Sequence, residues 1–303
     1  MNDKIKIAAV VVTYNRIELL KQCIDSLKNQ SHKLDEIIIV NNLSSDGTLE
    51  WLNQQNDLTI ITQENSGSAG GQFTGIKTAY EKGYDWIWCI DTDIIFEANT
   101  LEAMINSGYF LSASTGFLSS VIFFPDGNLA YPNIPELDKP YELLNSIALE
   151  KPVPILSASF GSLLIKREVI KHVGYPSKDF FIWGDDAEYT LRVIKNGYKG
   201  FLVLTSKAVH DCGENNEKPY LKLESRDPKF RYGVRNMVYV AKLRNQIIYN
   251  STLRGYLSGF AFVLKLYTDH KYYSKTFAPG YLLDCISLYI KGVMFKPKII
   301  KPD

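Results

Sequence analysis

Hydrophobic residues in the first 95 positions form short continuous runs that alternate with helical stripes. Residues 5–12, Ile-Lys-Ile-Ala-Ala-Val-Val-Val, are a β-branched run typical of a strand covered on both faces of a parallel sheet. Apolar residues recur at helical spacing over 18–29, which predicts a helix. The alternation continues with predicted strands at 36–40, 58–62 and 86–90 and predicted helices at 49–55 and 75–82. This order predicts an α/β nucleotide-binding half with ligands at the carboxyl ends of the strands.

The pattern is less regular after residue 95. The Pro-rich stretch 131–140 indicates a long loop among short strands. The other predicted elements are strands at 121–124, within 155–165 and at 200–204, and helices at 100–107, 168–173, 186–196, 220–249 and 253–267. The second half of the chain therefore predicts a smaller group of strands followed by a helical C-terminal region.

Charge and cysteine content exclude several classes of protein. The 303 residues include 34 Lys and Arg against 33 Asp and Glu, so no overall field attracts nucleic acid. The four cysteines are far apart without zinc-site spacing, which indicates a reducing compartment. The N-terminus does not resemble a signal peptide, and the apolar stretches 256–267 and 281–295 are too short and too charged to span a bilayer. We expect a cytoplasmic protein.

Two acidic residues follow the aromatic-rich strand predicted at 86–90. Asp91 and Asp93 flank Thr92, so both carboxylates can reach one divalent cation from a rigid strand end. The alternative is a pair of solvated loop carboxylates. The position after the fourth strand favours a metal site, because ligands are expected at that edge of the sheet.

A second acidic group lies in the sequence Trp183-Gly-Asp-Asp-Ala-Glu-Tyr. Like charges this close raise one another's pKa, which suits a carboxylate that accepts a proton near neutral pH. The alternative is a helix start with acidic residues in its first turn. Both interpretations are compatible: Asp185 caps and orients, Asp186 reacts, and Trp183 offers a face for a sugar ring.

Polar residues follow the other predicted strands. Thr13-Tyr14-Asn15-Arg16, Asn41-Asn42 and the Gly-rich sequence after Asn65 each lie where a nucleotide would bind, although each also suits an ordinary turn. His210 is a further candidate ligand, and its alternative is a structural histidine.

The ordered motifs Thr-Tyr-Asn-Arg, Asn-Asn-x-Ser-x-Asp-Gly-Thr, Asn-x-Gly-x-x-Gly-Gly, Asp-x-Asp and Trp-Gly-Asp-Asp-Ala-Glu-Tyr with a later His resemble family 2 of the inverting GT-A glycosyltransferases. Bacterial galactofuranosyltransferases and rhamnosyltransferases look most similar. The resemblance implies a GT-A fold in residues 1–215, with a nucleotide-sugar half at about 1–95 and an acceptor half at about 96–215, followed by a helical region at 216–303.

The resemblance also implies roles for individual residues. Asp186 would be the general base, with Asp185 beside it, and Asp91, Asp93 and His210 would bind Mn²⁺ or Mg²⁺. The implied acceptor residues are Trp183, Asp185 and Glu188, and the implied donor residues are Thr13, Tyr14, Asn15, Arg16, Asn41, Asn65, Gly70 and Thr92. Two positions depart from the relatives, since Thr92 replaces a middle Asp and Asn41 replaces an Asp that accepts from the pyrimidine. The stretch Tyr232-Gly-Val-Arg235-Asn236 also resembles a motif of these relatives.

The implied activity is inverting transfer of a sugar from a UDP-galactofuranose or dTDP-rhamnose type donor to a hydroxyl of a glycan or lipid-linked glycan, in cell-surface polysaccharide synthesis. A sugar nucleotidyltransferase is one alternative, but the first loop lacks the Gly-rich sequence expected for a triphosphate. A non-catalytic carbohydrate-binding protein is another, and it would need no metal pair.

The C-terminal region is both basic and aromatic. From Arg244 onward, nine Lys and Arg oppose three Asp, an excess of +6. This composition predicts contact with the inner face of an anionic membrane, or else aromatic residues that pack a small helical subdomain or a homodimer interface while the lysines keep it soluble.

Overall fold

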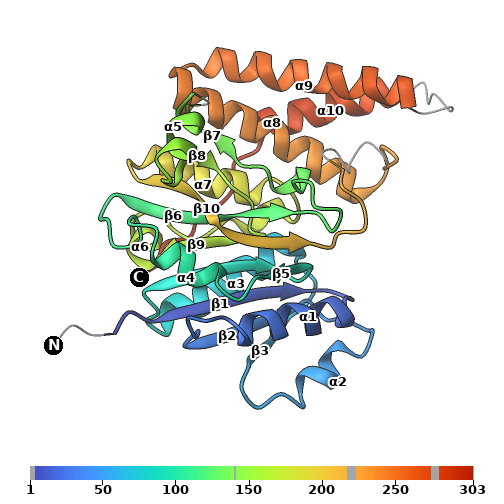
Figure 1. Cartoon of the computed structure of the whole chain (residues 1–303). Coiled ribbons are helices and arrows are strands. Elements are labelled where there is room, and N and C mark those ends of the chain that lie inside the picture. The colour runs from blue at the N-terminus through green and yellow to red at the C-terminus, as the bar shows by residue number, and fades with distance from the viewer. Residues whose placement is uncertain (1–3, 140, 217–222, 274–279, 303) are drawn as a thin grey trace.

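The computed structural model describes residues 4–139, 141–216, 223–273 and 280–302. In this part of the chain a ten-stranded mixed sheet runs through the molecule, and helices cover both of its faces (Figure 1). The parallel half has the order β3 (Thr59–Thr62), β2 (Glu36–Asn41), β1 (Ile7–Thr13) and β4 (Trp86–Asp91). All seven residues of β1 are buried, as its β-branched run predicted.

The other half of the sheet mixes strand directions. β9 (Leu163–Lys166) lies antiparallel between β4 and β6 (Thr115–Phe123), so the two halves form one continuous sheet. The remaining strands are β10 (Lys199–His210) parallel to β6, β8 (Val153–Ser157) and β7 (Glu136–Leu137) at the edge, and β5 (Ile94–Phe96) antiparallel to the last residues of β10.

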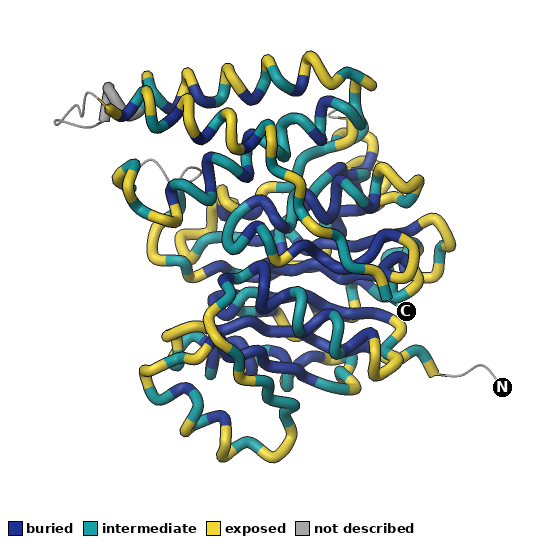
Figure 2. Tube along the Cα trace, turned by 180° about the vertical axis from the view of Figure 1, so that it is seen from behind, coloured by how far each residue is buried: buried dark blue, intermediate teal, exposed yellow. Residues whose placement is uncertain are grey.

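Two groups of helices cover the two faces, each with its own hydrophobic core. The first group is α1 (Ile17–Lys28), α2 (Thr48–Leu52) and α4 (Thr100–Ile105), and the second is α3 (Gly67–Glu81), α6 (Arg167–Val173) and α7 (Asp185–Lys195). The strands between them are buried along most of their length (Figure 2). The α/β class predicted from the sequence is confirmed.

α3 begins at Gly67, whereas the sequence predicted a loop there and a helix only from residue 75. The glycines are needed for close packing. A Cβ atom at Gly71 would lie 2.3 Å from Val12 Cγ1, and one at Gly75 would lie 2.2 Å from Val10 Cγ1. The Gly-rich sequence therefore brings a helix onto β1, and its interpretation as a loop is wrong.

Other boundaries also differ from the predictions. The sequence predicted strands at 121–124 and 200–204, whereas β6 begins at Thr115 and β10 continues to His210. Both strands contain bulges, and these interrupt the hydrophobic alternation on which the predictions depended. The stretch 155–165 holds parts of two strands. Five short elements were not predicted: the strands β5 and β7, the helix α5 (Glu142–Ala148), and the 3₁₀ turns η1 (Tyr131–Asn133) and η2 (Lys178–Phe180).

Three helices form a layer at one end of the molecule: α8 (Pro228–Tyr249), α9 (Thr252–Tyr273) and α10 (Tyr281–Met294) (Figure 1). They share a core of their own, so the predicted helical C-terminal region is confirmed. The first predicted turns of the helix at 220–249 include residues outside the described part of the chain. In the described residues, no helix is both long and apolar enough to cross a membrane.

Candidate active site

Two sequence-distant strands bring Asp93 and His210 together. The antiparallel pairing of β5 with β10 sets Ile94 opposite His210, and the Asp211 N–H donates to the Asp93 carbonyl at 2.9 Å. The His210 Nε2 atom then lies 3.3 Å from Asp93 Oδ1. The Arg16 guanidinium donates to the other carboxylate oxygen, Oδ2. Asp93 and His210 are buried, while Arg16 approaches them from the exposed loop after β1.

The pKa values of the Asp91 and Asp93 carboxyl groups are shifted in opposite directions. Burial, together with the charges of Asp93 and Asp186, raises the pKa of Asp91 to about 7. Burial alone would raise the pKa of Asp93 as well. The hydrogen bond from His210 and the positive charges of His210 and Arg16 outweigh burial and hold that pKa below its ordinary value.

Asn133 fixes the orientation of the His210 ring, and sequence reasoning missed it. Its Oδ1 lies 2.6 Å from His210 Nδ1, and its Nδ2 donates to Ser159 Oγ at 2.7 Å. Because the amide nitrogen is used by Ser159, the oxygen faces His210 and accepts a proton from Nδ1. The Nε2 atom on the other side of the ring is thereby directed towards Asp93 Oδ1. The only sequence signal is the Pro-Asn pair of a 3₁₀ turn.

The residues predicted to bind a donor differ widely in exposure. Tyr14, Asn15 and Arg16 are exposed on the loop after β1. Thr13 is 1% exposed and its Oγ1 has no hydrogen-bond partner in the described structure. Thr92 is buried and its Oγ1 donates to the Val12 carbonyl at 2.6 Å, which ties the end of β4 to β1.

Asn41 lies beneath the surface of this edge. Its Oδ1 accepts from the Ser44 N–H at 3.0 Å, while its buried Nδ2 has no partner among the described residues. The amide oxygen is therefore engaged within the protein, and the unpartnered atom is a donor. Asn15 also holds the loop after β2, because its Oδ1 accepts from the Ser45 N–H at 2.7 Å.

The start of α3 is held by its own local contacts. Asn65 is exposed, and its Oδ1 accepts from the Gly67 N–H at 3.0 Å. Gly70 is buried against the side chain of Ser66, where an added Cβ would lie 2.1 Å from Ser66 Oγ. Gly70 therefore serves packing, and Asn65 holds the first turn of α3.

The predicted acidic cluster lies at the N-terminal end of α7, beside the strand ends. Asp185 is 4% exposed, and its Oδ2 has no hydrogen-bond partner within the described structure. Asp186 accepts from the Ala187 N–H through Oδ1 at 2.7 Å. Burial raises the pKa of both carboxyl groups, and the charges of Asp186 and Asp91 raise that of Asp185 further. These interactions link the Asp91–Asp93 group to the start of α7.

Glu188 is separated from that cluster. It is 1% exposed, and both of its carboxylate oxygens accept from Arg192, at 2.7 and 3.0 Å. The same guanidinium donates to the carbonyls of Val173 and Tyr175. Because Arg192 occupies both carboxylate oxygens of Glu188, the geometry assigns this residue to the packing of α7.

The 179–184 loop, which contains Trp183 and leads into α7, is clamped from α8. The buried Asn236 Nδ2 donates to the carbonyls of Phe180, Ile182 and Trp183 at 2.9, 2.9 and 2.8 Å. Arg235 donates to the Asp179 carbonyl at 2.7 Å and to Asn236 Oδ1. This clamp holds an unusual backbone, since Trp183 has a φ of 61°.

The same loop contacts the start of α3. The Phe181 carbonyl accepts from the Ala69 N–H at 3.2 Å, and a Cβ at Gly67 would lie 1.9 Å from that carbonyl oxygen. Gly67 has a φ of 75°, so only glycine suits this contact. The loop after β3 and the loop before α7 therefore meet.

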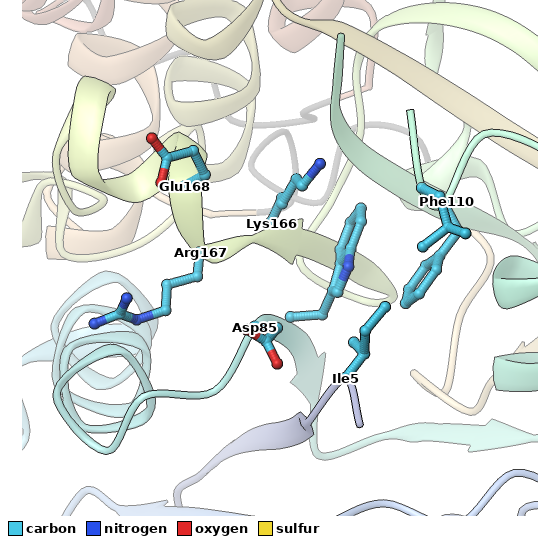
Figure 3. A pocket seen from close by; sticks show the side chains of 8 residues that line it. Ile5, Asp85, Phe110, Lys166, Arg167 and Glu168 are labelled. Carbon is cyan, nitrogen blue, oxygen red and sulfur yellow. The ribbon is translucent and has the colours of Figure 1, made fainter. Parts of the chain in front are cut away.

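A pocket on the other edge of the sheet is unrelated to this cluster (Figure 3). Its lining includes Ile5, Asp85 and Trp86, which precede or begin β1 and β4, together with Lys166 and Glu168. Those residues lie at the amino ends of the parallel strands, whereas the Asp93–His210 cluster lies at the carboxyl ends.

The metal ligands predicted from the sequence are only partly assembled. The Asp93–His210 pair offers an oxygen and an imidazole nitrogen, a donor set that divalent cations accept. Across the residues described, no three His, Cys, Asp or Glu side chains form a group that could hold a metal ion. Any cation bound by Asp93 and His210 would therefore need further ligands from elsewhere.

Known structures share this fold. GalNAc-T7, solved with UDP, GalNAc and Mn²⁺, has a TM-score of 0.60 at 14% identity over 89% of this chain and 55% of its own. TarS 1–349 of S. aureus has a TM-score of 0.58 at 16% identity, over 95% of this chain and 81% of its own. The sheet, its covering helices and the strand-end cluster define a protein of the GT-A glycosyltransferase fold class.

The sequence comparisons narrow the class. The model of glycosyl transferase family 2 matches residues 8–174, and the chain belongs to that family. The galactofuranosyltransferase GlfT1 of Mycolicibacterium smegmatis is 27% identical over 236 residues, which cover 71% of this chain and 74% of that protein. GlfT1 of Mycobacterium tuberculosis is 26% identical over 70% of this chain and 72% of its own. The family resemblance is confirmed, and the chain is a glycosyltransferase.

Proposed function

We propose that the protein transfers a sugar, with inversion, from a UDP-galactofuranose or dTDP-rhamnose type donor to a hydroxyl of a glycan or lipid-linked glycan. One observation carries this proposal: the carboxyl group of Asp91, at the end of β4 and next to Asp93, interacts through its charge with the carboxyl groups of Asp185 and Asp186 at the start of α7. The similarity to galactofuranosyltransferases supports the donor class. Residues 1–215 form the catalytic domain in this proposal, with donor and acceptor halves that meet near residue 95.

The donor diphosphate lies at the loop after β1 in this proposal. Tyr14 and Arg16 are exposed there, and Arg16 reaches the Asp93 carboxylate. Asn15 and Asn41 hold the neighbouring loop after β2, Thr92 ties the strand ends together beneath it, and Thr13 has a buried hydroxyl without a partner in the described structure. Asn65 and Gly70 set the position of α3 beside them.

Asp93 and His210 would hold Mn²⁺ or Mg²⁺, with Asp91 as a further ligand in this proposal. The oxygen and nitrogen donors of this pair support the assignment, and two GT-A neighbours, GalNAc-T7 and the Pyrobaculum calidifontis mannosyltransferase PcManGT, were solved with Mn²⁺. When bound, the cation supplies positive charge that stabilises the departing diphosphate.

Asp186 is the general base. Burial raises the pKa of its carboxyl group, which makes the carboxylate a better proton acceptor for the acceptor hydroxyl. Asp185 is buried in the first turn of α7, where Gly184 and not Asp185 is the N-cap. Trp183, two residues before Asp185, covers one face of the acceptor sugar in this proposal. A single attack from the face opposite to the leaving diphosphate inverts the anomeric carbon.

Asp186→Asn tests the proposal, because it keeps the shape of the side chain and removes the proton acceptor. Transfer should fall by about 100-fold or more, while calorimetric affinity for the nucleotide diphosphate stays within about twofold. The assay offers a panel of UDP-, dTDP- and GDP-sugars with Mn²⁺ and follows the anomeric configuration by NMR. An inactive Asp185→Asn together with a normal Asp186→Asn would move the base to Asp185, and retention of configuration would contradict the mechanism.

A further inference from the structure

α9 and α10 each expose a row of apolar side chains on the side that faces away from the rest of the protein. The side chains recur every three or four residues on each helix, so each set lies on one face, and they are 37% to 70% exposed. We call them the α9–α10 apolar face: Leu253, Leu257, Phe260 and Leu264 on α9, and Leu283, Ile286, Ile290 and Met294 on α10. The layer that carries this face lies at the end of the molecule remote from β1–β3 (Figure 1).

The helices do not need this face for their own packing. Val263 and Leu266 of α9 and Cys285 and Leu288 of α10 are at most 2% exposed and form the core shared with α8. Each helix is therefore apolar on two sides, one inward and one outward. Adjacent outward rows of exposed apolar side chains indicate an interaction site.

The two rows join into one surface. The rings of Phe260 and Tyr289 meet at the seam between the helices, with centroids 5.6 Å apart. Tyr289 Oη donates to the Tyr256 carbonyl at 3.2 Å, which holds α9 and α10 side by side. Ile286 and Ile290 flank Tyr289 on α10, so the apolar rows continue across the seam.

Positive charges lie along the outer edges of this surface. At 3.6 residues per turn, Arg254 and Lys265 lie on the flank of α9 that faces away from Phe260. Lys291 lies on the flank of α10 that faces away from Tyr289. All three cations are exposed. The centre of the surface is therefore apolar and its two edges are basic.

The described residues of the two helices carry no exposed carboxylate. Their acidic residues are Asp269 and Asp284, which are both half-buried, and Asp284 accepts from Ser225 Oγ at 2.7 Å. In a symmetric dimer through this face, the cations of the two copies would meet without opposite charges. An anionic bilayer supplies both an apolar layer and phosphate charge at its surface.

We propose that the α9–α10 apolar face docks on the surface of an anionic lipid bilayer, with the leucine and isoleucine side chains inserted at the headgroup boundary and the cations among the lipid phosphates. Docking does not depend on the donor proposed above. It bears on the proposed acceptor, because a lipid-linked acceptor would lie in the same membrane surface to which the enzyme is bound.

Co-sedimentation of the full chain with vesicles tests the docking. Vesicles of phosphatidylglycerol and phosphatidylcholine in equal amounts should bind the protein, and pure phosphatidylcholine should bind it at least about tenfold less. The triple variant Leu257→Ser, Leu264→Ser, Ile290→Ser should lose vesicle binding, and Arg254→Glu, Lys265→Glu, Lys291→Glu should lose the preference for anionic lipid. Leu111→Ser, at a leucine that is 74% exposed on the catalytic domain, and Lys171→Glu, Lys195→Glu, at exposed lysines of α6 and α7, should change nothing.

Circular dichroism of each variant establishes that it is folded, and light scattering gives the mass in solution. A folded serine variant that binds vesicles as the wild type does would overturn the proposal. So would a wild-type dimer that ignores vesicles and becomes monomeric in the serine variant, which would assign the face to a second copy. Vesicle binding without sugar transfer would retain the docking surface and reject the proposed function.

Discussion

Positive groups hold the Asp93 carboxylate from two sides, His210 at one oxygen and Arg16 at the other. A divalent cation could replace part of that positive charge, which is why this residue is the most sensitive test of metal dependence. Asp93→Ala should lower transfer by at least about 100-fold, and chelation of the wild type should abolish transfer until Mn²⁺ or Mg²⁺ is added.

His210→Ala should weaken Mn²⁺ affinity, measured by calorimetry in the presence of UDP, by about tenfold or more. His172→Ala is the matched control, because His172 is an exposed histidine of α6. Full activity of the wild type in excess chelator, or unchanged Mn²⁺ affinity in His210→Ala, would reject the metal site.

Asn133 tests whether ring orientation matters to that site. Asn133→Ala removes the acceptor from His210 Nδ1, so Mn²⁺ affinity in the presence of UDP should fall by about tenfold. Asn133→Asp keeps an acceptor oxygen at that position and should recover most of the affinity, while Asn128→Ala, at an exposed asparagine, should have no effect. Equal losses in the alanine and aspartate variants would mean that Asn133 serves only packing.

At the scale of elements, Glu36 joins three segments of the parallel half. It lies at the start of β2 and accepts hydrogen bonds from Thr59 of β3 and from Lys82 and Tyr84 after α3. Burial acts to raise the pKa of Glu36, but these hydrogen bonds and the charge of Lys82 lower it below its ordinary value. The bonded carboxylate therefore stabilises the fold.

Glu36→Gln should lower the free energy of unfolding by about 1–3 kcal/mol at neutral pH, measured by urea denaturation. Because the folded pKa is lowered, the contribution is present above the ordinary pKa of glutamate and is lost as the pH falls through the folded value. The difference between wild type and variant should therefore shrink in acid. Glu81→Gln, which breaks an exposed pair with Lys77, should cost less than about 0.5 kcal/mol. A difference that persists unchanged at low pH would contradict the assignment.

The sequence predicted most accurately those elements that have a regular hydrophobic pattern. β1, β2 and β4 are continuous apolar runs, and the structure confirms them within one or two residues. The start of α3 was missed because Gly67, Gly71 and Gly75 indicate a turn by composition, although their function is close contact with β1 and the 179–184 loop. Helix propensity gave no signal for packing between distant segments.

The candidate site shows the same limit. The order of the motifs predicted a site at the carboxyl ends of the strands, and Asp91, Asp93 and His210 do lie at neighbouring strand ends. The i,i+4 spacing of Glu188 and Arg192 on the predicted helix allows their ion pair, but the burial that commits both carboxylate oxygens of Glu188 to Arg192 arises only from tertiary packing. Asn133 carries no motif, because its role arises only from the tertiary contact with His210.

At the scale of the molecule, α8 connects the C-terminal layer to the site. Asn236→Ala removes three hydrogen bonds to the 179–184 loop, so the loop should leave its left-handed backbone at Trp183. Transfer should fall by about tenfold or more, and the Trp fluorescence should shift. Affinity for UDP should fall less than transfer does, because the residues proposed to bind it lie on other loops, although the start of α3 contacts this loop at Phe181.

Asn245→Ala is the matched control for that variant, since the Asn245 side chain is also buried on α8 but donates to the Ala241 carbonyl of its own helix. Wild-type activity and fluorescence in Asn236→Ala would show that the clamp is not needed. Equal losses in both variants would indicate general destabilisation of α8.

The insertion of β9 between β4 and β6 also sets an order of events during synthesis. β4 is complete at residue 91, but its antiparallel neighbour begins only at residue 163. Until that segment leaves the ribosome, the nascent parallel half has an open edge with unpaired N–H and C=O groups on an apolar strand. Pairings between segments so far apart form slowly, and an open edge of this kind is prone to aggregate. The growing chain should therefore require chaperone protection until its second half emerges.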